Sequence, residues 1–302
     1  MDDLPSVPVH PWILAARVKT LPAALVPVAV GTALALPRGT LRPGLVLSCA
    51  AFALLVQVAT NLANDLYDSK RGADTPARRG PVRVTAAGLV SPAAMGRALL
   101  LVNLAAILVG LPVVLARGPE MIPVGALALL AGWAYTGGPF PLAYHGLGDV
   151  FVILFFGVVA VSGTAYGLGG RLDLPVVLAG AGVGLLCDNL LVVNNARDRD
   201  TDAAVGKRTL VVRLGPSFAR GQYLLQAAAA FASPFALGAR VGAITLLAAP
   251  VAAWAGRRFD RAREGFEFNR ALALAAAALL AYGLALTVGL VLGAELRPGP
   301  SD

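Results

Sequence analysis

Asparagine and aspartate side chains recur at helical spacing where the apolar stretch 45–60 ends. Asn61, Asp65 and Asp68 lie at positions i, i+4 and i+7, so on a continuing helix they share one face. Asp74 follows shortly after a glycine at which the chain can turn. Carboxylates at the end of a hydrophobic helix are costly unless a cation lies among them. Because Mg2+ prefers oxygen ligands and shares them with substrate phosphates, this run predicts a metal and phosphate site.

A second copy of the pattern follows the apolar stretch 176–193. Asn194, Asp198 and Asp202 lie at i, i+4 and i+8, again on one helical face. The spacing Asn-x3-Asp of Asn61 and Asp65 therefore recurs in Asn194 and Asp198. A single acidic helix end is as easily a solvated cap, but two matched copies favour one site built from both. Basic residues trail each copy and suit the phosphate oxygens that a metal leaves uncovered; the candidates are Lys70, Arg78, Arg79, Lys207 and Arg208.

The composition is that of an integral membrane protein. Of the 302 residues, 57% are hydrophobic and only 14% are charged, and the mean hydropathy is +0.73. The apolar residues form long stretches rather than an alternating pattern, which indicates helices and excludes a barrel. The two cysteines, Cys49 and Cys187, lie inside apolar stretches, so neither a disulfide nor a zinc site is predicted. The predicted surroundings are a lipid bilayer, with no nucleic acid partner.

Nine stretches have roughly the twenty mostly apolar residues that a spanning helix needs. They cover about 17–36, 43–67, 92–116, 120–136, 149–168, 174–195, 217–237, 240–256 and 269–293. These spans predict an all-α polytopic protein. We interpret residues 12–295 as a single transmembrane domain, preceded by a short cytoplasmic segment, 1–11, and followed by a tail, 296–302.

The distribution of Lys and Arg predicts the orientation. With nine spans, nineteen of these residues lie on the side of the N-terminus and six on the other side. The positive-inside rule then places the N-terminal side, and both acidic motifs with it, in the cytoplasm. The motifs are four helices apart, an even number, so the internal repeat is predicted to be parallel. The predicted location is the cell membrane, with the site facing the cytoplasm.

Five further residues are weighed as site residues. Tyr135 and Tyr144 flank a Gly- and Pro-rich segment between the fourth and fifth stretches, and either contact an aromatic substrate or anchor the chain at the headgroups. Asp149 is equally consistent with an N-cap of the fifth helix and with a catalytic role. Lys19 either reaches an anionic substrate or extends to the headgroups. Asp188 lies within the sixth stretch, where a carboxylate suggests function.

The two motifs resemble those of UbiA-type intramembrane prenyltransferases. The residues that carry the resemblance are Asn61-x2-Asn64-Asp65-x2-Asp68 and Asn194-Asn195-x-Arg197-Asp198-x3-Asp202. The segments RRGPVR, YTGGPFPLAYHGLGD and GKRTLVVRLG are similar to the subfamily that acts on 1,4-dihydroxy-2-naphthoate in menaquinone synthesis. The resemblance covers about 12–156 and 188–214.

This resemblance implies nine helices around a central cavity, Mg2+, a polyprenyl diphosphate donor and an aromatic acceptor, 1,4-dihydroxy-2-naphthoate. It predicts one metal group of Asn61, Asp65, Asp68 and Asp74, and a second of Asn194, Asp198 and Asp202. Asp65, Asp68, Asp198 and Asp202 are the predicted catalytic residues. The predicted substrate contacts, besides the basic candidates, are Lys19, Asn64, Tyr135, Tyr144, Asp149 and Asn195. No general base can be identified from the sequence.

Two alternatives remain open at this point. A transporter or channel would use similar carboxylates along an ion path. Clustering at one membrane face, with bases beside each motif, favours a phosphate over a cation path. Another UbiA-type enzyme would use a different acceptor, such as 4-hydroxybenzoate, homogentisate or a porphyrin.

Overall fold

The computed structural model describes residues 10–38, 42–73, 80 and 82–294, and all regular structure within these ranges is helical. The helices are α1 Pro11–Ala16, α2 Pro22–Ala35, α3 Pro43–Lys70, α4 Pro92–Arg117, α5 Met121–Ala134, α6 Gly148–Val152, α7 Ala160–Gly167, α8 Leu174–Ala204, α9 Leu210–Ala232, α10 Ala239–Thr245, α11 Ala249–Arg261 and α12 Gly265–Ala294. A π-helical segment, Ile153–Val159, joins α6 to α7.

The predicted helical membrane class is confirmed, but the count of nine spans is not established. Six helices in the described ranges are long and apolar enough to cross a membrane: α3, α4, the continuous Gly148–Gly167 unit, α8, the Ala239–Arg261 unit and α12. Two more, α2 and α5, are apolar but shorter. The predicted seventh span corresponds to α9, which carries a kink at Gly215 and is not among the six.

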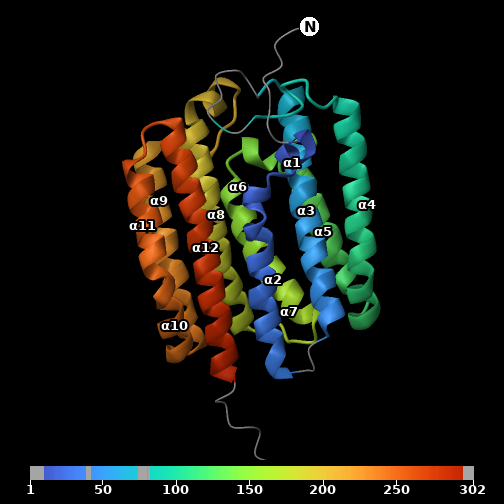
Figure 1. The fold of residues 1–302 in the computed structure, drawn as a ribbon, viewed down its shortest axis with the longest axis vertical. Coiled ribbons are helices and arrows are strands. Elements are labelled where there is room, and N and C mark those ends of the chain that lie inside the picture. The colour runs from blue at the N-terminus through green and yellow to red at the C-terminus, as the bar shows by residue number, and fades with distance from the viewer. Residues whose placement is uncertain (1–9, 39–41, 74–79, 81, 295–302) are drawn as a thin grey trace, which may run out of the picture.

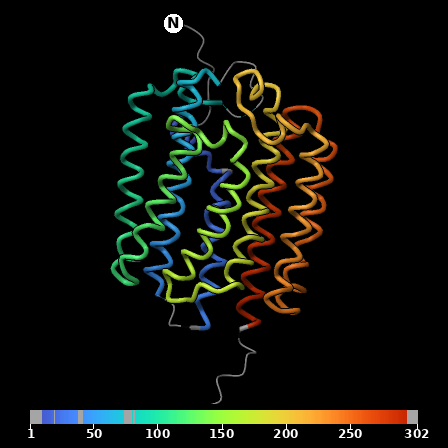
Figure 2. The backbone as a smooth tube through the Cα atoms, turned by 180° about the vertical axis from the view of Figure 1, so that it is seen from behind, coloured from blue at the N-terminus to red at the C-terminus, as the bar shows by residue number. Residues whose placement is uncertain are grey.

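The helices that carry the two motifs run in the same direction. Both α3 and α8 end at the end of the molecule where α1 lies, whereas α12 ends at the opposite end (Figure 1). Seen from behind, α4 and the group α9–α11 form opposite edges of the bundle (Figure 2). This arrangement agrees with a parallel repeat, in which corresponding helices bring their C-terminal ends to one side.

The lengths of α3 and α8 carry the motifs past the apolar layer. These helices have 28 and 31 residues, which at about 1.5 Å per residue gives lengths of about 42 and 46 Å. A bilayer's hydrocarbon core is only about 30 Å thick. Both helices begin with a proline in the first turn, where the missing N–H group costs nothing. The polar residues occupy the last turns, where the surplus length places them near the membrane surface.

Glycines let the α6–α7 unit pack closely against α8. A Cβ atom at Gly157 would overlap the Gly180 carbonyl oxygen and the Gly184 backbone. Without side chains at these positions, the two backbones approach directly, as in other small-residue contacts between membrane helices. The consequence is that the side chains of Asp149 on α6 and Asp188 on α8 lie in one region.

The orientation predicted from the distribution of Lys and Arg determines which introduced cysteines should react from each side. After Cys49 and Cys187 are replaced by alanine, Ser69→Cys and Thr201→Cys should react with an impermeant maleimide from the cytoplasmic side only. Leu172→Cys, in the exposed turn before α8, should react only from the opposite side. The cysteine-free variant measures background labelling. Reaction of positions 69 and 201 from opposite faces would contradict the parallel arrangement.

Candidate active site

Both motifs line one cavity of about 500 Å³, whose wall also includes Ile13 and Leu14 of α1. The cavity brings together residues of α3 and α8 that are more than a hundred positions apart in the sequence. Its lining includes Asn61, Asn64 and Asp68 from α3, and Asn194, Asn195, Asp198 and Asp202 from α8. The structure therefore joins the two acidic motifs in a single site.

Lysine and arginine side chains contact the carboxylates of this cavity. The Lys207 Nζ atom lies 3.8 Å from Asp68 Oδ2 and 3.7 Å from Asp202 Oδ1. The Nη2 atom of Arg83 lies 3.6 Å from the same oxygen of Asp68. Arg197 forms two hydrogen bonds of 2.8 Å to Asp198. Carboxylate oxygen atoms from both helices thus bind positive charge in this cavity, and oxygen atoms are the ligands that a hard divalent cation prefers.

The carboxylates are spread along the cavity rather than gathered at one point. Within the described ranges, no three Asp, Glu, His or Cys side chains are close enough to form a ready metal centre. Asp74 lies outside the described residues. The donor set fits a cation that takes some of its oxygen ligands from a bound phosphate, as Mg2+ commonly does.

Asp65 has a different position from the other motif residues. Its Oδ1 atom accepts the N–H group of Thr85 at 2.8 Å, and its Oδ2 atom accepts that of Val84 at 3.2 Å. Asp65 is 1% exposed and is absent from the cavity lining. This placement does not support the metal role predicted for Asp65, because its carboxylate lies outside the cavity lining and accepts from two backbone amides.

The Asn-x3-Asp pair on the cavity wall is Asn64 and Asp68, not Asn61 and Asp65. Asn61 also reaches the cavity, but its amide nitrogen donates to Ala16 O at 2.9 Å and to the Thr20 hydroxyl at 3.1 Å. These hydrogen bonds connect the segment before α2 to α3. The recurrence of the spacing in Asn61/Asp65 and Asn194/Asp198 holds in the sequence, but Asn64/Asp68 is the α3 pair of which both members share the cavity with Asn194 and Asp198.

The basic candidates divide into those at the cavity and those away from it. Lys207 lines the cavity. Lys70 is exposed and lies over the ring of Tyr67, and Arg208 is also exposed. Neither lines the cavity, so their placement does not support the predicted phosphate contacts. Arg78 and Arg79 lie outside the described residues, and so does the side chain of Lys19.

Three arginines that line the cavity, Arg17, Arg83 and Arg197, were not among the predicted site residues. Arg83 and Arg197 both line it and both contact motif carboxylates. Arg83 belongs to the basic run after the first motif, so the signal was present in the sequence but did not single it out. Arg197 lies within the second motif. Thr136, whose hydroxyl donates to Asn64 Oδ1 at 2.8 Å, has no comparable sequence signal.

The segment between α5 and α6 closes over the motif ends. Arg71, just after α3, donates to the carbonyl oxygens of Thr136 and, at 2.8 Å, of Gly138. From the second motif, the backbone N–H group of Arg208 donates to Tyr144 O at 3.0 Å. The carbonyl groups of this Gly- and Pro-rich turn therefore face arginines that follow two different helices, α3 and α8.

Tyr144 contacts a motif residue directly. Its hydroxyl donates to Asp68 Oδ1 at 3.0 Å, and its ring lies 5.3 Å from both the Arg71 guanidinium and the Lys207 ammonium. Burial, together with the Asp68 carboxylate, raises the pKa of Tyr144 above its ordinary value. The phenol therefore keeps its proton and holds Asp68 in place. Tyr135, in contrast, lines the cavity itself.

Asp149 is not an N-cap. Helix α6 begins at Gly148 with Leu147 in the N-cap position, and no side chain caps it. Asp149 lies in the first turn, is 4% exposed and lines the cavity. Its Oδ1 atom accepts a hydrogen bond of 2.7 Å from Gln222 of α9. The capping interpretation is wrong, because the helix starts two residues earlier than that interpretation requires.

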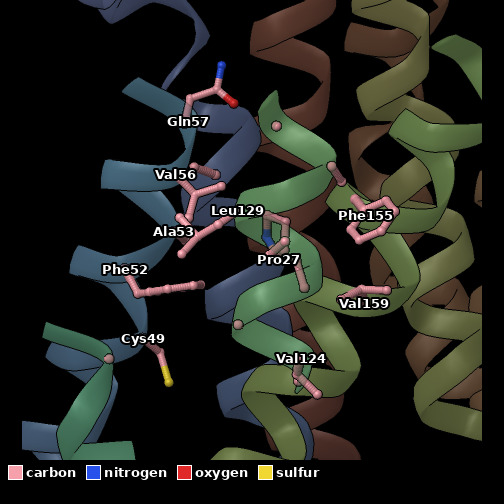
Figure 3. A pocket seen from close by; sticks show the side chains of 18 of the residues that line it. Pro27, Cys49, Phe52, Ala53, Val56, Gln57, Val124, Leu129, Phe155 and Val159 are labelled. Atoms are coloured by element: carbon pink, nitrogen blue, oxygen red, sulfur yellow. The ribbon is translucent and has the colours of Figure 1, made fainter. Parts of the chain in front are cut away.

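An apolar cavity of about 500 Å³ adjoins the polar one. In Figure 3, Phe52 and Val56 of α3 lie on one side of it and Phe155 and Val159 on the other. The two cavities share part of their walls, including Gln57, Thr60, Tyr135, Val152 and Phe156. The site is therefore bipartite, with a charged compartment that suits a phosphate group and an apolar compartment that suits a hydrocarbon chain.

Comparison with known proteins assigns the family. Residues 24–265 match the UbiA prenyltransferase family. A 1,4-dihydroxy-2-naphthoate octaprenyltransferase of Mycobacterium tuberculosis is 36% identical over 284 residues, 93% of this chain and 97% of that protein. The Escherichia coli enzyme of the same name is 38% identical over 251 residues, 80% of this chain and 82% of that protein.

A solved structure has the same fold. A UbiA homologue from Archaeoglobus fulgidus, bound to DMAPP and Mg2+, superposes with a TM-score of 0.65 at 13% identity, covering 92% of this chain and 99% of that one. At that identity the likeness concerns the fold alone, while the family model and the sequence relatives extend over most of the chain. This protein belongs to the UbiA prenyltransferase family.

Proposed function

We propose that this protein transfers a polyprenyl group from an isoprenyl diphosphate to 1,4-dihydroxy-2-naphthoate, with loss of CO2. The observation that carries the proposal is the junction of a charged cavity with an apolar one of similar volume. The relatives from M. tuberculosis and E. coli, named for this acceptor, support its identity. The transporter alternative is not retained, because the family is one of transferases.

The charged compartment receives the diphosphate. Lys207 and Arg83, which contact Asp68 from two sides, are placed to bind phosphate oxygens directly. Mg2+ bound in this cavity would neutralise the charge of the leaving diphosphate; the residues that would hold it are Asn64, Asp68, Asn194, Asp198 and Asp202. A UbiA homologue with DMAPP and Mg2+ bound supports this choice of metal.

The apolar compartment receives the prenyl chain. Its wall of alanine, valine, leucine and phenylalanine side chains keeps water from the allylic carbon while the carbon–oxygen bond breaks. The acceptor ring would reach that carbon where the two compartments meet. We place this site on the cytoplasmic side of the cell membrane, because the excess of Lys and Arg lies on the same side as both motifs.

The fate of the acceptor carboxylate tests the proposal. Attack by the ring carbon that bears the carboxylate gives a non-aromatic intermediate, and loss of CO2 restores aromaticity. With Mg2+, a polyprenyl diphosphate and carboxyl-labelled 1,4-dihydroxy-2-naphthoate, one labelled CO2 should be released for each product formed. Membranes without the protein are the control. Product that retains the label, or product from 4-hydroxybenzoate alone, would contradict this acceptor but not prenyl transfer.

A bulky side chain in the apolar cavity should select against long donors. Ala53→Trp, which fills part of the cavity lining, should lower kcat/KM for an octaprenyl donor about tenfold relative to geranyl diphosphate, since overpacking costs about 1–3 kcal/mol. Leu47→Trp, on the same helix at an exposed position, is the matched control and should leave the ratio unchanged. An equal loss with both donors would show that the long chain lies elsewhere.

A further inference from the structure

A buried network of acids and amides adjoins the cavity at α6. The Nε2 atom of Gln222 donates to Asp149 Oδ1 at 2.7 Å and to Asp188 Oδ2 at 3.2 Å. The Nε2 atom of Gln226 donates to the same oxygen of Asp188 at 2.6 Å. Asp188 is fully buried, and only Asp149 of the two acids reaches the cavity wall. Two carboxyl groups from α6 and α8 are thus bridged by one amide nitrogen of α9.

The network has more hydrogen-bond acceptors than donors. Three of its buried oxygen atoms have no hydrogen-bond partner: Asp188 Oδ1, Gln222 Oε1 and Gln226 Oε1. Within the described part of the chain, neither Asp149 nor Asp188 is paired with a lysine or arginine. Unsatisfied buried acceptors are costly, and two carboxylates this close disfavour double ionisation. The cluster is therefore suited to take up a proton or to accept from a hydroxyl group of a ligand.

The position of Asp149 relates this network to the reaction. Asp149 lines the charged cavity, and Val152 and Phe156, farther along the same helical unit, line both cavities. A donor with its diphosphate in one compartment and its chain in the other must place its allylic carbon near this shared wall. An acceptor ring that approaches this carbon would bring its hydroxyl groups toward Asp149.

We propose that Asp149, backed by Asp188 and Gln222, accepts a hydrogen bond from the acceptor hydroxyl next to the attacked carbon and acts as its proton acceptor. This inference rests on the proposed function. As the new carbon–carbon bond forms, the donor's carbon–oxygen electron pair leaves on the diphosphate. The hydroxyl proton of the acceptor moves to the Asp149 carboxylate, and the acceptor becomes a neutral ketone at that carbon. When the bond to CO2 breaks, its electron pair restores the aromatic ring and the oxygen recovers the proton. No net proton is consumed.

The test compares substrate and protein changes in one cycle. Asp149→Asn, which keeps an acceptor for Gln222, should lower kcat with the dihydroxy acceptor about a hundredfold, the lower end of the usual contribution of proton transfer. Methylation of the acceptor hydroxyl next to the carboxylate should lower kcat of the wild-type protein by a similar factor. The same methylation should lower kcat of the Asp149→Asn variant hardly further. Methylation of the other hydroxyl should affect both proteins equally. KM for the donor should not change.

Controls separate this role from a structural one. Asp260→Asn, an exposed acid far along the chain, should behave as wild type in every arm, and thermal unfolding in detergent should show that Asp149→Asn is folded. If it is not, Gln222→Glu takes its place in the cycle, because it keeps the side-chain size and replaces the amide nitrogen that donates to Asp149 and Asp188 with a carboxylate oxygen. The proposal would be overturned if the losses of kcat from Asp149→Asn and from methylation simply multiplied, or if Asp149→Asn had the kcat of the wild-type protein. If wild-type protein prenylates only another hydroxylated ring, the proposed acceptor fails, and the same cycle is run with the methyl ether of that ring.

Discussion

Replacement of Asp68 by asparagine is expected to lower kcat by about a hundredfold to a thousandfold, the usual loss when one preorganised electrostatic contact at a reacting centre is removed. Asp68 connects several groups of the site, since it contacts Tyr144, Arg83 and Lys207. Asparagine keeps the size and can still accept from Tyr144, so the fold should persist. What is lost is the negative charge that holds cations against the diphosphate.

Diphosphate release and product formation at saturating donor measure this effect, with a Mg2+ titration of each variant. Asp202→Asn should show the same direction, because Lys207 lies between both carboxylates. Asp200→Asn is the matched control on α8: its side chain is 77% exposed and pairs with Arg199, so turnover should be unchanged. Near-normal turnover of Asp68→Asn would remove the two-motif mechanism.

The loss caused by Asp65→Ala is expected to depend on Arg83. Removal of the carboxylate leaves two buried backbone N–H groups, those of Val84 and Thr85, without their acceptors. At about 1–3 kcal/mol for an unsatisfied buried group, the segment should shift and withdraw Arg83 from Asp68. We expect kcat/KM for the donor to fall about ten- to a hundredfold, because each 1.4 kcal/mol corresponds to a factor of ten.

A double-mutant cycle distinguishes this role from metal binding. If Asp65 acts by positioning Arg83, then Asp65→Ala should cost little more in an Arg83→Ala background than Arg83→Ala costs alone. Asp65→Asn, which retains one acceptor oxygen, should restore part of the activity. Losses that multiply, with a weaker response to Mg2+ in Asp65→Ala, would instead favour the original prediction that Asp65 binds the metal.

Local patterns in the sequence were sufficient for the class of protein and the chemistry of the site. Long apolar stretches require membrane helices whatever their neighbours, because unpaired backbone groups are not tolerated in lipid. Asparagine and aspartate at helical spacing require a shared face, because that periodicity is a property of a single helix. The trailing bases indicated phosphate because cationic side chains bind phosphate oxygens. Both motifs could therefore be assigned to one end of the bundle before any tertiary contact was known.

Only the tertiary structure decided which of these residues reach the cavity. Asn61/Asp65 and Asn64/Asp68 have the same spacing, so nothing in the sequence distinguishes them, and the rotation of α3 against α8 turns the second pair inward. The bridge from Asp149 to Gln222 likewise joins residues 73 positions apart. A repeated spacing specifies a face relative to its own helix axis, whereas the direction of that face depends on packing between helices and on loop contacts, here the hydrogen bonds of the Val84 and Thr85 N–H groups to Asp65.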